Sequence, residues 1–201
     1  MGRFIVIEGL DGAGTTTQAE RLCASLTARG VEVVRTAEPT TGPIGRMIRA
    51  VLRGEPDAPS KASLPWLFAA DRADHLARLV EPGVARGAWV VSDRYLPSSL
   101  AYQSLDHPLE QIVALNATFR APDLLIMVDI DVDTALDRIT ARGAAREIFE
   151  ERAALAAIAA RYAEVMPTLV ARGWRVVHID GALAIDDVAA QIGAAVDALD
   201  A

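Results

Sequence analysis

IEGLDGAGTTTQ, residues 7–18, begins at the end of the apolar run FIVI and is the stretch that decides the fold. In the motif G-x-x-x-x-G-K-[ST], a loop between a strand and a helix holds phosphates through its backbone amides. A lysine of the motif reaches the β and γ phosphates, and a hydroxyl binds magnesium. Gly9, Gly14 and Thr16 match this motif, but Thr15 stands where the lysine belongs. The stretch therefore predicts a phosphate-binding loop that lacks one cation.

The loop can bind phosphate without the lysine, because its amides and the dipole of the following helix both favour an anion. Thr16 is placed to bind Mg²⁺. The alternative is that residues 15–17 only cap the helix, as threonines often do. The predicted phosphate-binding residues are Gly9, Leu10, Asp11, Gly12, Ala13, Gly14, Thr15, Thr16 and Thr17.

Short apolar, β-branched runs alternate along the chain with longer segments of helical periodicity. Strands are predicted at residues 3–8, 31–36, 88–93, 124–129 and 175–179. Helices are predicted between the first two strands and at residues 44–52, 63–86, 109–119, 132–142, 149–172 and 185–199. This alternation is typical of a parallel sheet flanked by helices and predicts an α/β fold class. In such folds, ligands bind at the carboxyl ends of the strands.

Composition favours a soluble protein with a single domain over residues 1–201. The net charge of −7 argues against general binding to nucleic acid, which requires a basic face. Charged residues interrupt every long apolar stretch, so we expect no membrane span, and the first residues do not resemble a signal peptide. A single cysteine excludes an internal disulfide. These features predict a cytoplasmic location.

Two further polar clusters bear on the site. SDRYLPSSLAYQ, residues 92–103, has Asp93 and Arg94 at a predicted strand end, where an aspartate can hold magnesium and an arginine can grip phosphate. The rest of this stretch reads as a loop and the start of a helix. WLFAADRADHL, residues 66–76, places Phe68 and Arg72 one helical turn apart, so a ring and a guanidinium can hold a flat base. The alternatives are an ordinary salt bridge and a core position for Phe68.

The order and spacing of four motifs resemble the thymidylate kinase family, which phosphorylates dTMP with ATP. The motifs are GLDGAG at 9–14, EP at 38–39, LFAADRA at 67–73 and DRYLPSSLAYQ at 93–103. The resemblance runs from residue 3 to about the final helix. It implies a three-layer P-loop kinase fold with a five-stranded parallel sheet and a lid segment near residues 138–150. It further implies ATP as co-substrate, Mg²⁺ as cofactor and a homodimer.

The resemblance also implies roles for individual residues. Phe68 would stack on thymine, Arg72 would bind the edge of the base, and Tyr102 would press against the deoxyribose. IDGALAIDDV, residues 179–188, resembles the loop and last helix beside the adenine in this family. The implied dTMP-binding residues are Asp11, Glu38, Pro39, Arg49, Phe68, Arg72, Arg94, Ser99, Tyr102 and Gln103, with Arg49 and Arg94 on the phosphate. The implied magnesium ligands are Thr16 and Asp93.

Three departures from the family pattern weaken the phosphate clamp. Thr15 replaces the lysine, Ala37 replaces an arginine that often precedes Glu-Pro, and REIFE at 146–150 lacks the Asp-Arg pair common in the lid. Phosphoryl transfer depends on positioning and electrostatic stabilisation, so a missing cation bears on the mechanism itself. One alternative is therefore a nucleotide-binding or regulatory protein of this family with impaired catalysis. Another is a kinase for a different nucleoside monophosphate.

Arginines of the lid are the expected substitutes for the missing lysine. Arg142 and Arg146 would reach the transferring phosphate when the lid closes, as an arginine finger in the same chain does. Together with Asp11 and Arg94 they form the predicted catalytic set. The alternative for the two lid arginines is a solvated helix end.

Arg142→Ala and Arg146→Ala are expected to lower the turnover number much more than the affinity for dTMP. The physical reason is that a lid arginine would act on the transferring group and not on the bound nucleoside. Steady-state kinetics and calorimetric titration with dTMP measure the two quantities. Unchanged turnover in both variants would contradict the expectation.

Overall fold

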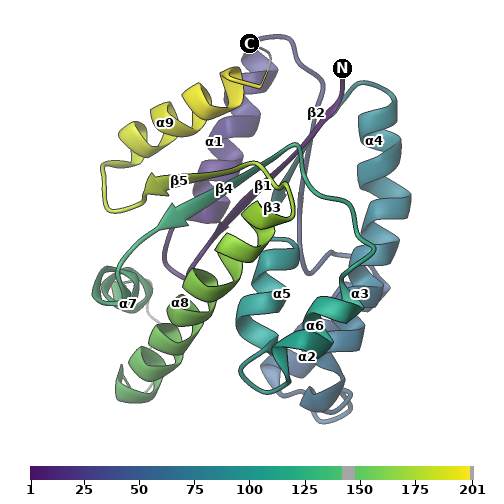
Figure 1. The fold of residues 1–201 in the computed structure, drawn as a ribbon, viewed down its shortest axis with the longest axis vertical. Coiled ribbons are helices and arrows are strands. Elements are labelled where there is room, and N and C mark those ends of the chain that lie inside the picture. The colour runs from purple at the N-terminus through teal and green to yellow at the C-terminus, as the bar shows by residue number, and fades with distance from the viewer. Residues whose placement is uncertain (142–147, 200–201) are drawn as a thin grey trace.

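A parallel sheet forms the centre of the computed structural model, which describes residues 1–141 and 148–199 (Figure 1). Within these residues the sheet has five strands, in the order β2-β3-β1-β4-β5. They are β1 (Arg3–Gly9), β2 (Val33–Ala37), β3 (Trp89–Asp93), β4 (Leu124–Asp129) and β5 (Val176–Asp180). Every neighbouring pair is parallel. The predicted strands and the α/β fold class are therefore confirmed.

Burial on both faces explains why the inner strands are continuous apolar runs. In β1, Phe4 and Val6 face one layer of helices and Ile5 and Ile7 face the other, because successive side chains alternate across a strand. All four side chains are fully buried. Since β1 pairs with β3 on one side and β4 on the other, the carboxyl ends of three strands lie together.

Two helices cover the face of the sheet that holds Ile5 and Ile7. They are α1 (Thr15–Ala28) and α9 (Ile185–Asp197), which Figure 1 shows on the same side of the sheet. Their buried apolar residues recur at helical spacing and include Ala19, Leu22, Leu26, Val188, Ile192 and Val196. This periodicity is the signal that predicted both helices from sequence.

The opposite face carries a larger set of helices, which completes the three layers. A continuous helical run comprises α3 (Leu64–His75), the π-helical turn η2 (Leu76–Val80) and α4 (Glu81–Ala85). The hydrophobic core on this face, which contains Phe4 and Val6 of β1, also includes residues of three other helices. They are α5 (Leu96–Gln103), α6 (Leu109–Leu115) and α8 (Ile148–Ala171). The remaining elements are α2 (Pro43–Arg53), the 3-10 helix η1 (Lys61–Ser63) and α7 (Val132–Ala141).

The observed helices differ from the predicted ones in two respects, and part of the predicted lid is not described. The predicted helix at 63–86 contains the π turn η2, which was not predicted because one extra residue in a turn leaves the apolar pattern largely intact. α5 was predicted only as a helix start, since LPSSLAYQ is short and contains a proline and two serines. Residues 142–147 of the predicted lid, with Arg142 and Arg146, lie outside the described residues.

α8 contains a 20-residue stretch, Arg152–Ala171, that is long and apolar enough to cross a membrane by length and composition alone. Core helices of soluble proteins meet the same criterion. In this helix Leu155, Tyr162 and Leu169 are buried in the protein interior. Burial therefore accounts for part of this stretch, of which 33% is buried inside the protein.

Ile126→Ala in β4 is expected to lower the free energy of unfolding by about 2–5 kcal/mol, because the Ile126 side chain is fully buried between the sheet and α1 and α9. The matched control is Ile185→Ala at the start of α9, where the side chain is 48% exposed. The control should change stability by no more than about 0.5 kcal/mol. Urea denaturation measures both, and equal losses would contradict this description of the core.

Candidate active site

The loop between β1 and α1 has a backbone that requires glycine at two positions. Gly12 and Gly14 have φ angles of +90° and +88°. A Cβ at Gly12 would also lie 2.6 Å from the carbonyl oxygen of Ala135 in α7. Gly14 is the N-cap of α1, and no side chain in the described part of the chain caps that helix. The first amides of α1 therefore remain available to an anion.

Thr16 connects the start of α1 to the end of β3. Its hydroxyl donates to Oδ2 of Asp93 at 2.5 Å and so does not cap its own helix. The second carboxylate oxygen, Oδ1 of Asp93, is buried without a hydrogen-bond partner among residues 1–141 and 148–199. Hydroxyl and carboxylate oxygens are the ligands that Mg²⁺ prefers. The pair therefore fits a magnesium site in which one acceptor is still unused.

A magnesium ion at this pair would need further ligands. In the residues that the structure describes, no group of three or more His, Cys, Asp or Glu side chains is placed to hold a metal ion. Mg²⁺ sites in phosphate-transferring proteins commonly use one or two carboxylates, water and the phosphates of the substrate. The oxygens of Thr16 and Asp93 fit a site of this kind.

Arg94 follows β3 and has a φ angle of +71°, a left-handed conformation that costs a non-glycine residue on the order of 1–3 kcal/mol. Its guanidinium donates to the carbonyl of Gly9 at 3.1 Å and to the hydroxyl of Ser98 at 3.1 Å. It also donates to Oδ1 of Asp11 at 2.6 Å. Arg94 is thus a cation held directly against the glycine-rich loop.

A cavity of about 450 Å³ opens beside Arg94 and extends between α3 and α5. Nine of the ten predicted dTMP-binding residues line it. They are Asp11, Glu38, Pro39, Phe68, Arg72, Arg94, Ser99, Tyr102 and Gln103. Because α3 and α5 lie on the same face of the sheet, residues far apart in sequence converge on one hollow.

Arg49 is the exception among the predicted dTMP-binding residues. Its guanidinium donates to the carbonyl oxygens of Pro39 and Thr40. It lines a neighbouring cavity of about 470 Å³ at the end of β2, together with Thr16 and Asp93. The structure therefore places Arg49 near the predicted metal ligands and outside the cavity that holds the other nine.

Several polar atoms around the 450 Å³ cavity are buried without a partner in the described part of the chain. They are Nε of Arg72, the hydroxyl of Tyr102 and Oε1 of Gln103. Unpaired buried polar groups are rare in folded proteins. Burial also raises the pKa of Tyr102 to about 12, against the opposing effect of Arg94, so the phenol keeps its proton at neutral pH. Two donors and one acceptor therefore lie unpaired and buried among the residues that line this cavity.

Arg72 is fully buried in α3 and belongs to an internal polar network. Its guanidinium donates to Oε2 of Glu38 at 2.7 Å, to the hydroxyl of Ser99 at 2.9 Å and to Oδ1 of Asn116. Oε1 of Glu38 lies 3.0 Å from Nδ1 of His75. Most of the bonding capacity of Arg72 is therefore already used within the protein, and its position is fixed before any ligand binds.

Glu8 is a site residue that the sequence analysis missed. It lies in β1 with no exposed surface. Its carboxylate accepts hydrogen bonds from the amides of Tyr95 and Ser98 and from the hydroxyls of Ser98 and Tyr162. Burial raises its pKa above the usual value, and Arg94 and these hydrogen bonds oppose that rise. A carboxylate inside an otherwise apolar strand was the signal that could have identified it.

A smaller cavity of about 250 Å³ lies on the other side of the loop, beside α9. It is lined by Gly12, Gly14 and Thr17 of the loop and by Gly181 of the segment predicted to lie beside adenine. Arg138 of α7 crosses this region and donates to the carbonyls of Gly181 at 2.9 Å and Gly12 at 3.5 Å. The glycine-rich loop therefore separates two cavities.

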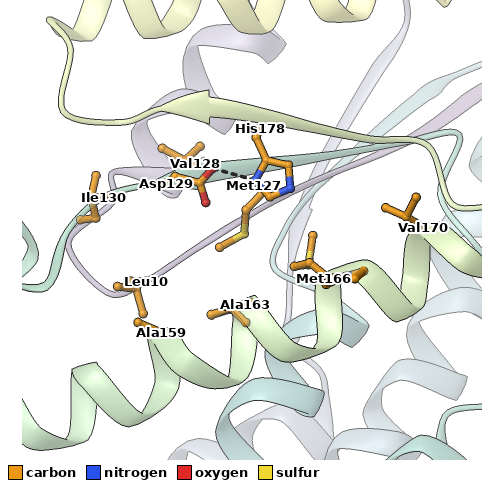
Figure 2. Close-up of a pocket in the computed structure, with 12 residues that line it drawn as sticks. Leu10, Met127, Val128, Asp129, Ile130, Ala159, Ala163, Met166, Val170 and His178 are labelled. Atoms are coloured by element: carbon orange, nitrogen blue, oxygen red, sulfur yellow. Dashed lines mark hydrogen bonds and ion pairs between the residues drawn. The ribbon is translucent and has the colours of Figure 1, made fainter.

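An apolar cavity of about 550 Å³ lies behind the loop, between α8 and the ends of β4 and β5. Figure 2 shows Leu10 beside Ala159 at one end of it and the pair of Asp129 and His178 on the strands. Nδ1 of His178 is 2.7 Å from Oδ2 of Asp129. None of the residues predicted for the nucleotide sites lines this cavity except Leu10.

Thr15 is buried at the start of α1, with 6% of its surface exposed. The only lysine of the sequence, Lys61, lies on η1 and lines the 450 Å³ cavity beside Leu64 and Pro65. The described cations that touch the loop are Arg94 and Arg138. In the described residues, no lysine occupies the position that the loop motif normally gives it.

Comparison with known proteins agrees with this geometry. The family model described as Thymidylate kinase matches residues 7–192. A thymidylate kinase of Xanthomonas oryzae pv. oryzae (strain PXO99A) is 44% identical over 151 residues, which cover 74% of this chain and 65% of that protein. The match thus spans less than two thirds of the length of that relative.

Two other relatives are similar over a larger part of their own length. A probable thymidylate kinase of Thermococcus kodakarensis is 40% identical over 179 residues, 83% of this chain and 86% of that protein. A thymidylate kinase of Ruegeria pomeroyi is 43% identical over 155 residues, 75% of this chain and 74% of that protein. The similarity therefore extends across bacterial and archaeal sequences.

Arg72→Ala is expected to lower the free energy of unfolding by about 3–5 kcal/mol, because it leaves the buried Glu38 carboxylate without its guanidinium partner. The matched control is Arg78→Ala, which removes an ion pair with Asp74. The Arg78 side chain is 79% exposed. That change should cost less than about 1 kcal/mol. Chemical denaturation compares the two, and losses of equal size would contradict the buried network described above.

Proposed function

Because the chain belongs to the thymidylate kinase family, we propose that it transfers the γ-phosphate of ATP to dTMP and forms dTDP, a step towards dTTP. The observation that carries this proposal is the convergence of nine predicted dTMP-binding residues on one cavity beside the glycine-rich loop. An acceptor in that cavity would lie next to a phosphate donor on the loop. Such proximity is the main requirement of phosphoryl transfer.

The unpaired atoms of the cavity support a pyrimidine base as the ligand. Thymine presents carbonyl acceptors beside an imide N–H donor. Nε of Arg72 is an unused donor and Oε1 of Gln103 is an unused acceptor, so the two match that edge. Phe68 lies one helical turn from Arg72 and supplies a ring for stacking. We assign Ser99 to the same base pocket.

The proposed position of the sugar lies against Tyr102. This ring stands 5.3 Å from the guanidinium carbon of Arg94, so it lies beside the proposed phosphate position. A neutral phenol at this point leaves little room for a 2′-hydroxyl and favours a deoxyribose. The proposal therefore assigns the discrimination between deoxy and ribo substrates to Tyr102.

The proposed phosphate site of dTMP is built on Arg94, with Asp11 as its orienting partner at 2.6 Å. The Arg94 side chain is 20% exposed, so it is partly shielded from water. Arg49 would join the phosphate only after its side chain leaves the carbonyls of Pro39 and Thr40. Pro39 lines both cavities, whereas Glu38 lines only the cavity of about 450 Å³.

The proposed ATP site uses the loop amides and the positive end of the α1 dipole for the phosphates. The cavity of about 250 Å³, which Arg138 and Gly181 help to line, fits the adenine side. Thr16 and Asp93 would hold Mg²⁺, which when bound neutralises charge on the phosphates. Arg94 adds a fixed positive charge next to the transferring group, and Arg142 and Arg146 of the lid complete the proposed catalytic set.

Thr15 favours a second candidate function, a nucleotide-binding or regulatory protein of this family with impaired catalysis. The loop lacks the lysine that reaches the β and γ phosphates. A unit charge at about 4 Å can contribute roughly 4 kcal/mol at an effective dielectric of about 20, equivalent to about 1,000-fold in rate. Arg94 and Arg138, which both touch the loop, are the described cations that can offset this loss.

We also propose that the protein is cytoplasmic and forms a homodimer. Met47 and Leu52 on α2 and Trp66 on α3 are large apolar side chains with roughly half of their surface exposed. A second copy of the chain would cover them. Light scattering of the purified protein tests this, and a monomeric mass at micromolar concentration would rule it out.

The proposed activity predicts ADP release that depends on dTMP and on magnesium. Steady-state assays with ATP compare dTMP with dUMP, dCMP, dGMP and no acceptor, with and without EDTA. Turnover should be specific to dTMP, and EDTA should abolish it. Phe68→Ala should raise the KM for dTMP roughly 5- to 150-fold, since base stacking contributes about 1–3 kcal/mol, while the KM for ATP stays unchanged.

Thr15→Lys distinguishes the two candidate functions. Turnover in the unmodified protein supports the kinase. Binding of dTMP without turnover, together with activity gained on Thr15→Lys, supports the impaired nucleotide-binding protein. Preference for another acceptor would assign the site to a different nucleoside monophosphate.

A further inference from the structure

Glu8 is a buried carboxylate to which the proposed phosphoryl transfer assigns no role. It lies in β1 immediately before the glycine-rich loop. It lines none of the four cavities described above. A carboxylate in the core is retained only with compensating partners, so its four hydrogen bonds indicate what it does.

Two of these hydrogen bonds come from the N-terminus of α5. Oε1 of Glu8 accepts from the amide of Tyr95 at 2.8 Å and from the amide of Ser98 at 3.1 Å. Tyr95 is the N-cap of α5, and no side chain of its own caps the helix. The N-cap acceptor that a helix normally finds in its own sequence is therefore supplied by a distant strand.

The same carboxylate limits the conformation of Arg94, which directly precedes this N-cap. The amide of Arg94 donates to the carbonyl of Ile7 at 2.9 Å. The next amide along the chain, that of Tyr95, donates to Glu8. The left-handed backbone of Arg94, with φ of +71°, is thus held from both sides by consecutive residues of β1.

The side chain of Arg94 is connected to Glu8 as well. The hydroxyl of Ser98 lies 2.8 Å from Oε2 of Glu8 and accepts a hydrogen bond from the Arg94 guanidinium at 3.1 Å. The guanidinium also reaches Gly9 and Asp11, as described above. Ser98 therefore bridges the buried carboxyl group of Glu8 to the cation of the proposed phosphate site.

The fourth hydrogen bond comes from α8. The hydroxyl of Tyr162 donates to Oε2 of Glu8 at 2.9 Å and lies 3.0 Å from the hydroxyl of Ser98. Tyr162 is fixed by burial, with 2% of its surface exposed. α8 is the helix that follows the predicted lid in sequence. One carboxylate therefore joins β1, α5 and α8 at the base of Arg94.

We propose that Glu8 is a positioning residue that holds Arg94 in its left-handed conformation, with its guanidinium towards the dTMP phosphate, through Ser98 and the N-terminus of α5. This inference rests on the proposed function of Arg94 as a phosphate ligand. Glu8 itself touches no substrate. Tyr162 makes the orientation of Arg94 depend on the position of α8.

The test is a double-mutant cycle between Glu8→Gln and Arg94→Ala. Glu8→Gln keeps the shape of the side chain but replaces one of its two acceptor oxygens with an NH2 group, which cannot accept a hydrogen bond. It is expected to raise the KM for dTMP by about 10-fold or more, because small misplacements of a binding group are costly, and to leave the KM for ATP within about 2-fold. In the Arg94→Ala background the same change should have no further effect on the KM for dTMP. If the two changes instead raise the KM for dTMP independently, so that their fold-changes multiply in the double variant, the proposal is overturned.

Ser98→Ala and Tyr162→Phe keep the proposal testable if Glu8→Gln does not fold. Ser98→Ala removes the bridge to the guanidinium and should also raise the KM for dTMP selectively. Its control is Ser104→Ala at the other end of α5, where the serine is buried, whereas Ser98 is partly buried, and where the hydroxyl has no partner among the described residues. The control should leave both KM values unchanged, and an equal effect of the two serine changes would contradict the proposal.

A crystal structure of the Glu8→Gln variant separates this inference from the proposed function. In one outcome, the unmodified protein does not phosphorylate dTMP, and in the variant Arg94 loses its positive φ angle and its contact with Gly9. The proposed function then fails, and the positioning role of Glu8 stands. If the unmodified protein is active and Arg94 is unchanged in the variant, with the same KM for dTMP, the positioning role fails and the function stands.

Discussion

Parallel hydrogen bonding of β1 to its two neighbours is the constraint on which the candidate site depends. Ile7 of β1 lies opposite Asp93 of β3, and Gly9 of β1 lies opposite Val128 of β4. This alignment brings the glycine-rich loop, the predicted metal ligand and Arg94 to one edge of the sheet. A shift of one residue would turn every side chain of β1 to the other face. The Glu8 carboxylate would then leave α5 and face the layer of α1 and α9.

Arginines provide the positive charge around the candidate site, and two of them, Arg94 and Arg72, are already held by contacts within the protein. Arg94 is bound to Gly9, Ser98 and Asp11, and Arg72 is bound to Glu38, Ser99 and Asn116. A charge that is already oriented needs no reorganisation during the reaction, which is the basis of electrostatic catalysis. Rigid, forked guanidinium groups suit this arrangement better than a flexible ammonium group. A loop without lysine is therefore compatible with a site that depends on preorganised arginines.

Local patterns carried most of the sequence-based prediction. Strand positions and the α/β fold followed from periodicity, and the pair of Phe68 and Arg72 followed from helical spacing, because each signal lies within a few residues. Tyr102 was assigned through the resemblance to the thymidylate kinase family. Arg49 was assigned to the dTMP cavity, yet its direction depends on which carbonyls of residues 39 and 40 are within reach. Glu8 was missed because its partners are 87 to 154 residues away in sequence. Such contacts exist only after the chain has folded, so no local pattern reports them.

The unpaired atoms around the 450 Å³ cavity also affect the stability of the folded chain. Each buried polar group without a partner costs the folded chain about 1–3 kcal/mol, and a ligand that pairs them removes that cost. Since such a ligand binds the folded chain and not the unfolded one, mass action stabilises the fold as its concentration rises. Proteases in a cell act on the unfolded fraction. A molecule that fills the cavity and pairs these atoms would therefore lower the unfolded fraction on which proteases act.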